Sequence, residues 1–511
     1  MVDRDSVRQL LALAGSRPAL TLVAGRDQQL AWSCDDLQRQ RRHAERVLTD
    51  CGLRAGDKLL LMSANNPQVF AVLLAALSLR LCLCPLVPDT AAHQLQAILR
   101  QQQPRLAIID DATLASRFPG IGLLQLHERD DDWLQRLRSA AETDASRPDA
   151  TADCRNEPLL LFHSSGSTGQ PKAIRYTQAT LNHFLLRLHE LYAAFSDADV
   201  GCVPSARVNV LPVLHFGGLS FCLQSLLEGR CVHLLRSQEP EDHLALLACS
   251  RCQLILLIPA LLQALLDCDV STQLPALRHV LAMGEAVSVA QLRRLSAHLR
   301  LRVHNAYGMS ECLTGIYNRA DDDKAPLGSC GRLRFGEVKL VAEDGNEDPW
   351  QGELWVRNST TTPCYTDAAL TQRKYHDGWY RTGDRLCRDR NGYYFFIGRA
   401  DLMIVINGRN IYPQEVEQVL VAHPAVTACV AQALTLAEGK QRLVVLVETG
   451  AGLSVTAAEL IDFYLQRGAL YAAPACVHFV ERLPRLGTGK PDRQACAALL
   501  AGLVLAAEVA A

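Results

Sequence analysis

The chain has 511 residues, of which 49% are hydrophobic and 21% are charged, and its formal net charge is −2 at pH 7. Both fractions are ordinary for a soluble globular protein and argue against a disordered chain. A protein that binds the backbone of DNA or RNA normally has a basic excess, so 52 basic against 54 acidic residues argue against nucleic acid as the main partner. The length predicts two or more domains.

The two ends of the chain contain no obvious targeting or membrane segment. Residues 1–8 mix both charges, and the apolar stretch after them is broken at residues 15–17, which is a poor signal peptide. The tail at residues 495–511 is rich in Ala and Leu but too short to span a bilayer, and it includes Glu508. We expect a last helix there, and a cytoplasmic protein with no membrane span.

The 18 cysteines are scattered along the chain, which predicts reduced, buried side chains. Cys249 and Cys252 form one Cys-x-x-Cys pair, but a zinc site needs a second pair at defined spacing. We therefore interpret these cysteines as structural.

The predicted elements in the middle of the chain alternate between strands and helices. A polar connection at residues 143–156 precedes an apolar strand at 158–164, which leads into a Gly-rich loop. Strands are then predicted at 253–258, 277–283 and 301–306, and helices at 260–266 and 288–299. This alternation predicts an α/β fold with parallel sheets and flanking helices. Ligands in such folds gather at the carboxyl ends of strands, where the Gly-rich loop and residues 307–311 both lie.

A smaller unit follows near residue 400. Asn391-Gly392 predicts a turn, and residues 393–396 a strand that leaves it. Strands are then predicted at 426–433, 442–448 and 476–480, and a helix at 457–466. We place a domain boundary here, with a large domain at residues 1–399 and a small α+β domain at 400–511.

The loop at residues 164–172 carries the groups that bind phosphate. Its glycines let the backbone approach an anion, its hydroxyls can donate to phosphate oxygens, and its lysine adds a positive charge. These groups are Ser164, Ser165, Gly166, Ser167, Thr168, Gly169 and Lys172. The Gly-x-x-x-x-Gly-Lys-Ser/Thr spacing is absent, which disfavours a P-loop kinase or ATPase.

The loop resembles the phosphate loop of the adenylate-forming superfamily, which includes acyl- and aryl-CoA synthetases, adenylation domains of peptide synthetases, and luciferases. Other segments resemble further motifs of that superfamily, in its order. They are an adenine and magnesium motif at 305–311, a ribose motif at 380–384, a hinge motif at 398–401 that continues at 407–417, and a terminal lysine motif at 487–490. Five matches in the right order argue against chance.

The resemblance implies an enzyme that uses ATP and Mg²⁺. Glu311 is a hard oxygen ligand suited to Mg²⁺, Tyr307 offers a flat face for adenine, Asp384 can accept from the ribose hydroxyls, and Arg399 can bind ribose or phosphate. The remaining residues implied for nucleotide binding are Asn305, which could pair with the adenine amine, Ser310, which could donate to a phosphate, and Ala306, Gly308, Gly284, Glu285 and Ala286.

Catalysis is implied for Lys490, His215, Thr168 and Glu311. Lys490 would stabilise the charge that builds up between the attacking carboxylate and the α-phosphate. In the superfamily the small domain is mobile and rotates about the Asp401 position, after which the face around Gly408 admits a thiol.

Two departures concern the acceptor of the acyl group. Leu402 and Val405 stand where many relatives have a second acidic residue and a lysine. The apolar stretch at residues 402–406 resembles that part of fatty acyl-AMP ligases instead. The acceptor therefore stays open between CoA and the phosphopantetheine of an acyl carrier protein.

Residues 211–220 resemble the substrate motif of acyl- and aryl-CoA ligases such as succinylbenzoate–CoA ligases. His215 would abut the carboxylate of the acid. Phe216 stands where amino-acid-activating domains have an aspartate, and an unpaired buried ammonium would cost several kcal/mol, so an α-amino acid is disfavoured. Gly284, Glu285 and Ala286, with Met309 and Cys312, would line a pocket for an apolar acid, alkyl or aryl.

The leading hypothesis is an acyl- or aryl-CoA ligase that forms acyl-AMP, releases pyrophosphate and then forms a thioester. The alternatives are an acyl-AMP ligase that loads an acyl carrier protein, and a nucleotide-binding scaffold without catalysis. Intact Lys172, Glu311, Asp384 and Lys490 argue against the scaffold.

Overall fold

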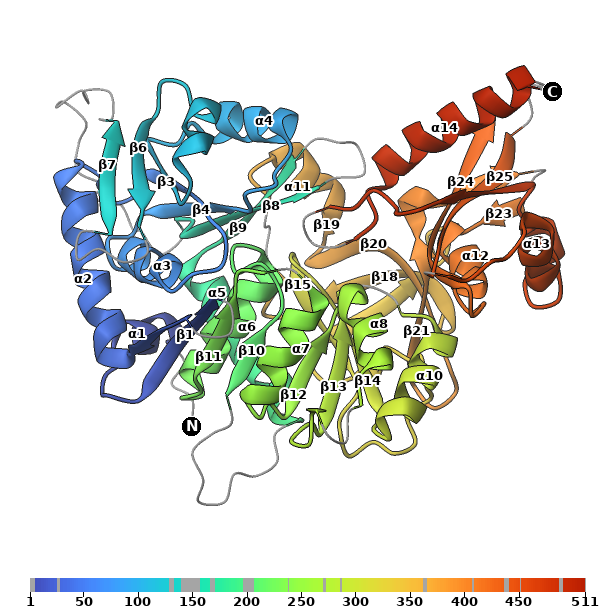
Figure 1. Ribbon diagram of the computed structural model, residues 1–511, viewed down its shortest axis with the longest axis horizontal. Coiled ribbons are helices and arrows are strands. Elements are labelled where there is room, and N and C mark those ends of the chain that lie inside the picture. Colours follow the sequence, from blue (N-terminus) through green and yellow to red (C-terminus); the bar gives the residue numbers. More distant parts are fainter. Residues whose placement is uncertain are drawn as a thin grey trace.

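Figure 1 shows the computed structural model of the chain, with a large body at the left and centre and a smaller one at the right. The structure describes residues 5–24, 28–127, 133–138, 157–165, 171–195, 206–237, 239–269, 273–284, 287–361, 365–406, 409–435, 441–450, 452–486 and 490–510. Within these ranges, no helix has the length and apolar character needed to cross a bilayer.

In the described residues, the first sheet of the large domain has seven strands, and the Gly-rich loop joins two of them at one edge. In spatial order they are β7 (Leu134–Arg138), β6 (Gly122–Leu126), β5 (Leu106–Ile109), β3 (Lys58–Met62), β4 (Cys82–Leu86), β8 (Leu160–Ser165) and β9 (Pro171–Tyr176). The inner five strands are parallel, and β7 and β9 are antiparallel to their neighbours. The inner parallel strands are mainly apolar on both faces because helices cover both. Leu60 and Met62 pack with α4 (Ala92–Gln102), whereas Leu59 and Leu61 belong to the main core with α3 (Gln68–Ser78).

Two further sheets lie below it in Figure 1. One has the order β10 (Arg207–Asn209), β11 (Val232–Leu235), β1 (Pro18–Ala24) and β2 (Gln28–Ser33), and the other has the order β12 (Leu254–Leu257), β13 (His279–Met283), β14 (Val303–Met309), β15 (Cys312–Tyr317) and β16 (Arg332–Leu333). β12, β13 and β14 are parallel, and β15 turns back antiparallel. The helices of this region are α1 (Ser6–Leu11), α2 (Cys34–Asp50), α5 (Gln178–Ala193), α6 (Phe216–Leu227), α7 (Pro240–Cys249), α8 (Pro259–Asp267) and α10 (Val289–Leu299).

An antiparallel sheet completes the large domain. Its order is β17 (Glu337–Val341), β18 (Gln351–Arg357), β20 (Trp379–Arg388) and β19 (Tyr375–His376), with β21 (Tyr394–Arg399) paired to β20. The helix α11 (Ala368–Lys374) runs directly into β19. Asp384 in β20 lies opposite Arg399 in β21. This sheet therefore brings the predicted ribose motif beside the predicted hinge.

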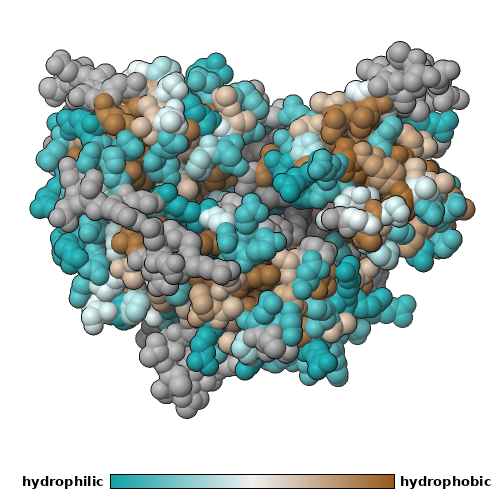
Figure 2. All heavy atoms as spheres, viewed as in Figure 1, coloured by the Kyte–Doolittle hydropathy of each residue, from teal (hydrophilic) through white to brown (hydrophobic). Residues whose placement is uncertain are grey.

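The small domain has its own apolar core. Its elements are β22 (Ile404–Ile406), β23 (Arg409–Ile411), α12 (Pro413–Leu420), β24 (Val426–Thr435), β25 (Gln441–Thr449), α13 (Ala457–Leu465), β26 (Cys476–Val480) and α14 (Arg493–Ala510). The main core of the large domain extends to Phe396, and the core of the small domain begins at Ile404. Figure 2 shows a notch at the surface between the two bodies. The boundary that we place between residues 399 and 400 lies between the two cores and stays a prediction.

The fold class predicted from the sequence is confirmed. The predicted strands and helices that lie in the described residues occur within a few residues of their expected bounds. One detail differs: β14 continues to Met309, beyond the predicted strand end at residue 306, before it turns into β15. The sequence pattern did not assign strands to individual sheets, and β8 belongs to a different sheet from β12–β14. The polar connection predicted at residues 143–156 lies outside the described residues.

Candidate active site

One cluster of predicted nucleotide-binding residues forms around Asp384 in β20. The side chain of Asp384 is only 6% exposed. Tyr307, from the parallel sheet, donates its hydroxyl to Asp384 Oδ2 at 2.5 Å. Nη1 of Arg399 lies 3.3 Å from Asp384 Oδ1, but Oδ1 accepts no hydrogen bond from the residues that the structure describes. An acceptor oxygen in this state suits a ligand hydroxyl.

Burial and the neighbouring charged and polar groups act on the pKa of Asp384 in opposite directions. Burial raises the pKa of Asp384, while Arg399 and the Tyr307 hydroxyl partly oppose that rise. Burial, with the nearby carboxylate, raises the pKa of Tyr307 well above its ordinary value, so the phenol stays protonated and remains a donor. Arg399 also donates to both oxygens of Asp401 at 2.9 Å. The predicted ribose residue and the predicted hinge residue therefore share one guanidinium group.

Glu311, the predicted magnesium ligand, is fixed by a tyrosine that the sequence reasoning did not single out. Tyr365 is 6% exposed and donates its hydroxyl to Glu311 Oε1 at 2.8 Å. The same hydroxyl lies 3.0 Å from that of Tyr380. Tyr365 also forms a β-bridge with Ile174, in the strand that follows the Gly-rich loop. No local pattern predicts this bond, because 54 residues separate its two partners.

The other residues of the adenine segment hold this part of the site in place. The backbone carbonyl of Ser310 accepts a hydrogen bond from the Tyr176 hydroxyl. The Asn305 side-chain nitrogen donates to the Ser329 carbonyl at 3.2 Å, which leaves its oxygen as the group that could accept from an adenine amine. The predicted residues that also belong to β14 are Ala306 and Gly308.

The second cluster joins the small domain to the predicted acid side of the site. Nζ of Lys490 donates to the Gly284 carbonyl, at the end of β13, at 2.5 Å. His215 caps the start of α6, and its Nδ1 accepts from the Gly217 N–H at 3.3 Å. Burial, with a smaller contribution from the positive charge of Lys490, lowers the pKa of His215 to about 4. The imidazole is therefore neutral at pH 7, and a neutral ring that accepts at Nδ1 carries its proton on Nε2.

The loop that presents His215 is fixed by close packing. A β-carbon on Gly218 would lie 2.3 Å from the Pro212 carbonyl oxygen, so only glycine allows this contact. Phe216 is 4% exposed. Its ring stacks on Tyr176 at 4.5 Å between centroids and meets Phe184 edge-on at 4.6 Å. Phe216 therefore lies in an apolar aromatic cluster, and its place beside the substrate stays a prediction.

Some predicted residues cannot be placed. Gly166, Ser167, Thr168, Gly169, Glu285, Ala286, Gly408 and residues 487–489 lie outside the described residues. The backbones of Ser164 and Ser165 belong to β8. Lys172 belongs to β9 and lies opposite Ser164 in the antiparallel pair of these two strands.

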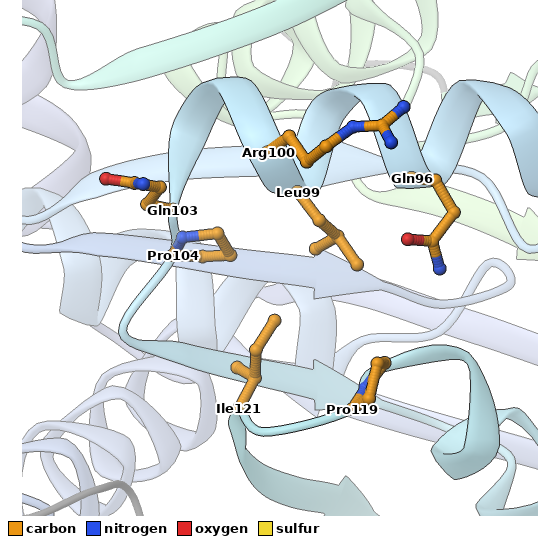
Figure 3. A pocket seen from close by; sticks show the side chains of 7 residues that line it. All are labelled: Gln96, Leu99, Arg100, Gln103, Pro104, Pro119 and Ile121. Carbon is orange, nitrogen blue, oxygen red and sulfur yellow. The ribbon is translucent and has the colours of Figure 1, made fainter.

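A separate depression of about 380 Å³ lies near the end of α4 (Figure 3). It is lined by Gln96, Leu99, Arg100, Gln103, Pro104, Pro119 and Ile121. Of the predicted site residues that the structure describes, none lines this depression.

Two family models match the chain, one in each of its two parts. The family described as "AMP-binding enzyme" matches residues 11–366, and the "AMP-binding enzyme C-terminal domain" matches residues 415–490. The chain belongs to the AMP-binding enzyme family. This confirms the predicted resemblance to the adenylate-forming superfamily and the prediction of an AMP-forming ligase.

Individual relatives match along nearly their whole length. The chain is 27% identical to the rat protein "Acyl-coenzyme A synthetase ACSM4, mitochondrial", over 96% of this chain and 88% of that one. It is 28% identical to the 2-succinylbenzoate–CoA ligase of Bacillus velezensis, over 88% and 89%. The structure of ATP-bound MatB from Rhodopseudomonas palustris has the same fold, with a TM-score of 0.81, 20% identity, and coverage of 97% and 98%.

Proposed function

We propose that this protein uses ATP to convert a carboxylic acid to an acyl-AMP and then transfers the acyl group to the thiol of CoA. In the first step a carboxylate oxygen attacks the α-phosphorus, the bond from that phosphorus to the bridging oxygen breaks, and pyrophosphate leaves. The observation that best supports this is the position of Lys490, which reaches from the small domain to Gly284, near His215.

The residues of this site have complementary roles in the proposal. The Nε2–H of neutral His215 donates to one oxygen of the acid and leaves the other free to attack. Lys490 stabilises the negative charge that develops between the two anionic reactants. On the nucleotide side, the Tyr307 ring covers adenine and Asp384 Oδ1 accepts from a ribose hydroxyl.

Glu311 suits a magnesium ion held mainly by the nucleotide. Mg²⁺ is usually bound by one or two carboxylates together with phosphates and waters. Tyr365 engages Oε1 of Glu311, so Oε2 is the oxygen available to the metal. A bound Mg²⁺ would neutralise phosphate charge, and the role of Tyr365 would be to hold the carboxylate in the required orientation.

The second step places a thiol sulfur on the acyl carbon, breaks the carbon–oxygen bond to AMP and releases a proton. CoA is the acceptor we favour, because the relatives described above are named as acyl-CoA synthetase and CoA ligase. An acyl carrier protein is the second candidate. Val405, on the short hairpin of β22 and β23, is 51% exposed, so an apolar side chain stands at the surface where many relatives have a lysine.

The acid that we propose has no ammonium group, because Phe216 and its aromatic neighbours supply no negative charge. An alkyl and an aryl acid both fit this description. The cytoplasmic location expected from the sequence stays a prediction, and the rat relative is named as mitochondrial.

The test is pyrophosphate release from ATP over a panel of alkyl, aryl and amino acids, with CoA or with a holo acyl carrier protein. We expect release with an alkyl or aryl acid, and little release from Lys490→Ala with ATP binding kept. Lys324→Ala, at an exposed lysine, is the control for loss of a positive charge. No release with any acid would favour a nucleotide-binding scaffold, and full activity of Lys490→Ala would refute the proposed mechanism.

A further inference from the structure

Lys374, the last residue of α11, lies inside the nucleotide cluster although no predicted motif includes it. A lysine in the last turn of a helix normally extends into solvent, where it complements the helix dipole. Here the chain turns back through β19 into β20 and brings Lys374 over Gly383, which has φ +79°. A β-carbon on Gly383 would lie 3.1 Å from Lys374 Nζ and 3.5 Å from Arg399 Nη2. The side-chain nitrogens of Lys374 and Arg399 therefore both lie beside Gly383, which has no side chain and directly precedes Asp384.

The carboxylates near Lys374 are already engaged by other groups. Glu353 accepts from Arg381 at 2.9 Å and from the Gly383 N–H at 3.1 Å. Asp401 is bound through both oxygens to Arg399. Within the described part of the chain, Lys374 has no hydrogen-bond or ion-pair partner at the usual distances. Its positive charge is thus available to a ligand.

The surroundings of Lys374 are those of an anion site. Burial lowers the pKa of Lys374, and the positive charges of Arg399 and Lys172 lower it further, against the opposing effect of Glu353 and Asp401. Lys172 is the last residue of the predicted phosphate loop, and Arg399 is on the ribose side of the cluster. A cation that interacts with both lies along the path of the triphosphate. Retaining an unpaired, half-buried cation there is unfavourable unless an anion binds.

We propose that Lys374 is a further phosphate-binding residue, which contacts the β- and γ-phosphates of ATP and the pyrophosphate that leaves. This inference depends on the nucleotide site of the proposed function. It assigns Lys374 to the polyphosphate and not to the nucleoside, so ATP and AMP should respond differently to its loss.

The test compares the dissociation constants of ATP and AMP for the full-length protein by calorimetry in Mg²⁺. Lys374→Met should weaken ATP binding about tenfold or more, because a charge-assisted contact is lost, and should leave AMP binding within about twofold. Lys374→Arg should retain most of the ATP affinity. The matched control is Arg373→Met, at the exposed neighbouring cation on the same helix, which should change neither constant.

Unchanged AMP binding in Lys374→Met also shows that the site is folded. Equal weakening of ATP and AMP would overturn the inference in favour of a structural role at the hinge, and unchanged binding of both would overturn it as well. Failure of the unaltered protein to bind ATP would instead reject the proposed nucleotide site itself.

Discussion

The hydrogen bond from Tyr307 to Asp384 offers a quantitative test of the nucleotide cluster. Tyr307→Phe removes the hydroxyl and keeps the ring. Because Asp384 is 6% exposed, water cannot readily replace the donor. A hydrogen bond to a charged group contributes about 1.5–3 kcal/mol, so the free energy of unfolding of the large domain should fall by about that amount.

The loss of unfolding free energy in Tyr307→Phe should also depend on pH. The Tyr307 hydroxyl lowers the pKa of Asp384 against the larger effect of burial, so its removal should raise that pKa further. A carboxyl group with a raised pKa in the folded state binds its proton more tightly than in the unfolded state. Its contribution to stability is therefore greatest at low pH and is lost as pH rises through the folded pKa. Tyr307→Phe should cost more at pH 8 than at pH 4.5, as measured by urea unfolding.

The chain offers a matched control in a buried tyrosine–aspartate pair that belongs to no predicted motif. Tyr393 is 1% exposed and donates to Asp322 Oδ1 at 2.8 Å, and Asp322 also pairs with Arg334 at 3.2 Å. Tyr393→Phe should destabilise the large domain by a similar amount and leave ATP affinity unchanged. If Tyr307→Phe stays within about 0.5 kcal/mol of the unaltered protein while the control is destabilised, the bond to Asp384 does not form in solution and the reasoning fails.

Three further predictions concern other parts of the large domain. Tyr365→Phe removes the hydrogen-bond donor of Glu311. It should reduce kcat/KM for ATP about tenfold or more and raise the Mg²⁺ concentration for half-maximal rate. An unchanged Mg²⁺ requirement would contradict this prediction. Gly218→Ala should lower the unfolding free energy by about 1–3 kcal/mol because of the backbone clash, whereas Gly502→Ala, with open space around it, should not, and equal melting temperatures would refute the clash. Burial, with a smaller effect of a nearby lysine, lowers the pKa of His163 to about 4. The free energy of unfolding should therefore fall as the pH drops from 6.5 to 4, by up to about 1.4 kcal/mol per pH unit. His163→Leu should flatten that slope in urea unfolding, and an identical slope would show that the imidazole takes up its proton in the folded state.

The sequence predicted the elements that carry the site because their signals are local. Apolar runs of strand length, each followed by a helical pattern, identified β12, β13 and β14, and the motifs at their ends indicated which chemistry to expect. What it could not predict was pairing between distant segments. The β8 strand has the same pattern as β12, yet it pairs with β4 in another sheet.

The same limit explains the two residues that the sequence reasoning missed. Tyr365 stands in a segment without periodicity, and only the tertiary structure brings its hydroxyl to Glu311. Lys374 follows Arg373 at the end of a short helix, where two cations indicate an exposed surface; the turn into β20 is what buries the second one. The roles proposed for the other site residues stay predictions until the variants are measured.

The guanidinium shared by Asp384 and Asp401 constrains how domains could be exchanged between relatives. A chimeric chain joined between residues 399 and 401 would take Arg399 from one parent and Asp401 from the other. Joined after Asp401, it would keep the whole Asp384–Arg399–Asp401 set from the parent that supplies the large domain. The useful junction for grafting a new small domain therefore lies after Asp401 and before Ile404, where the core of the small domain begins.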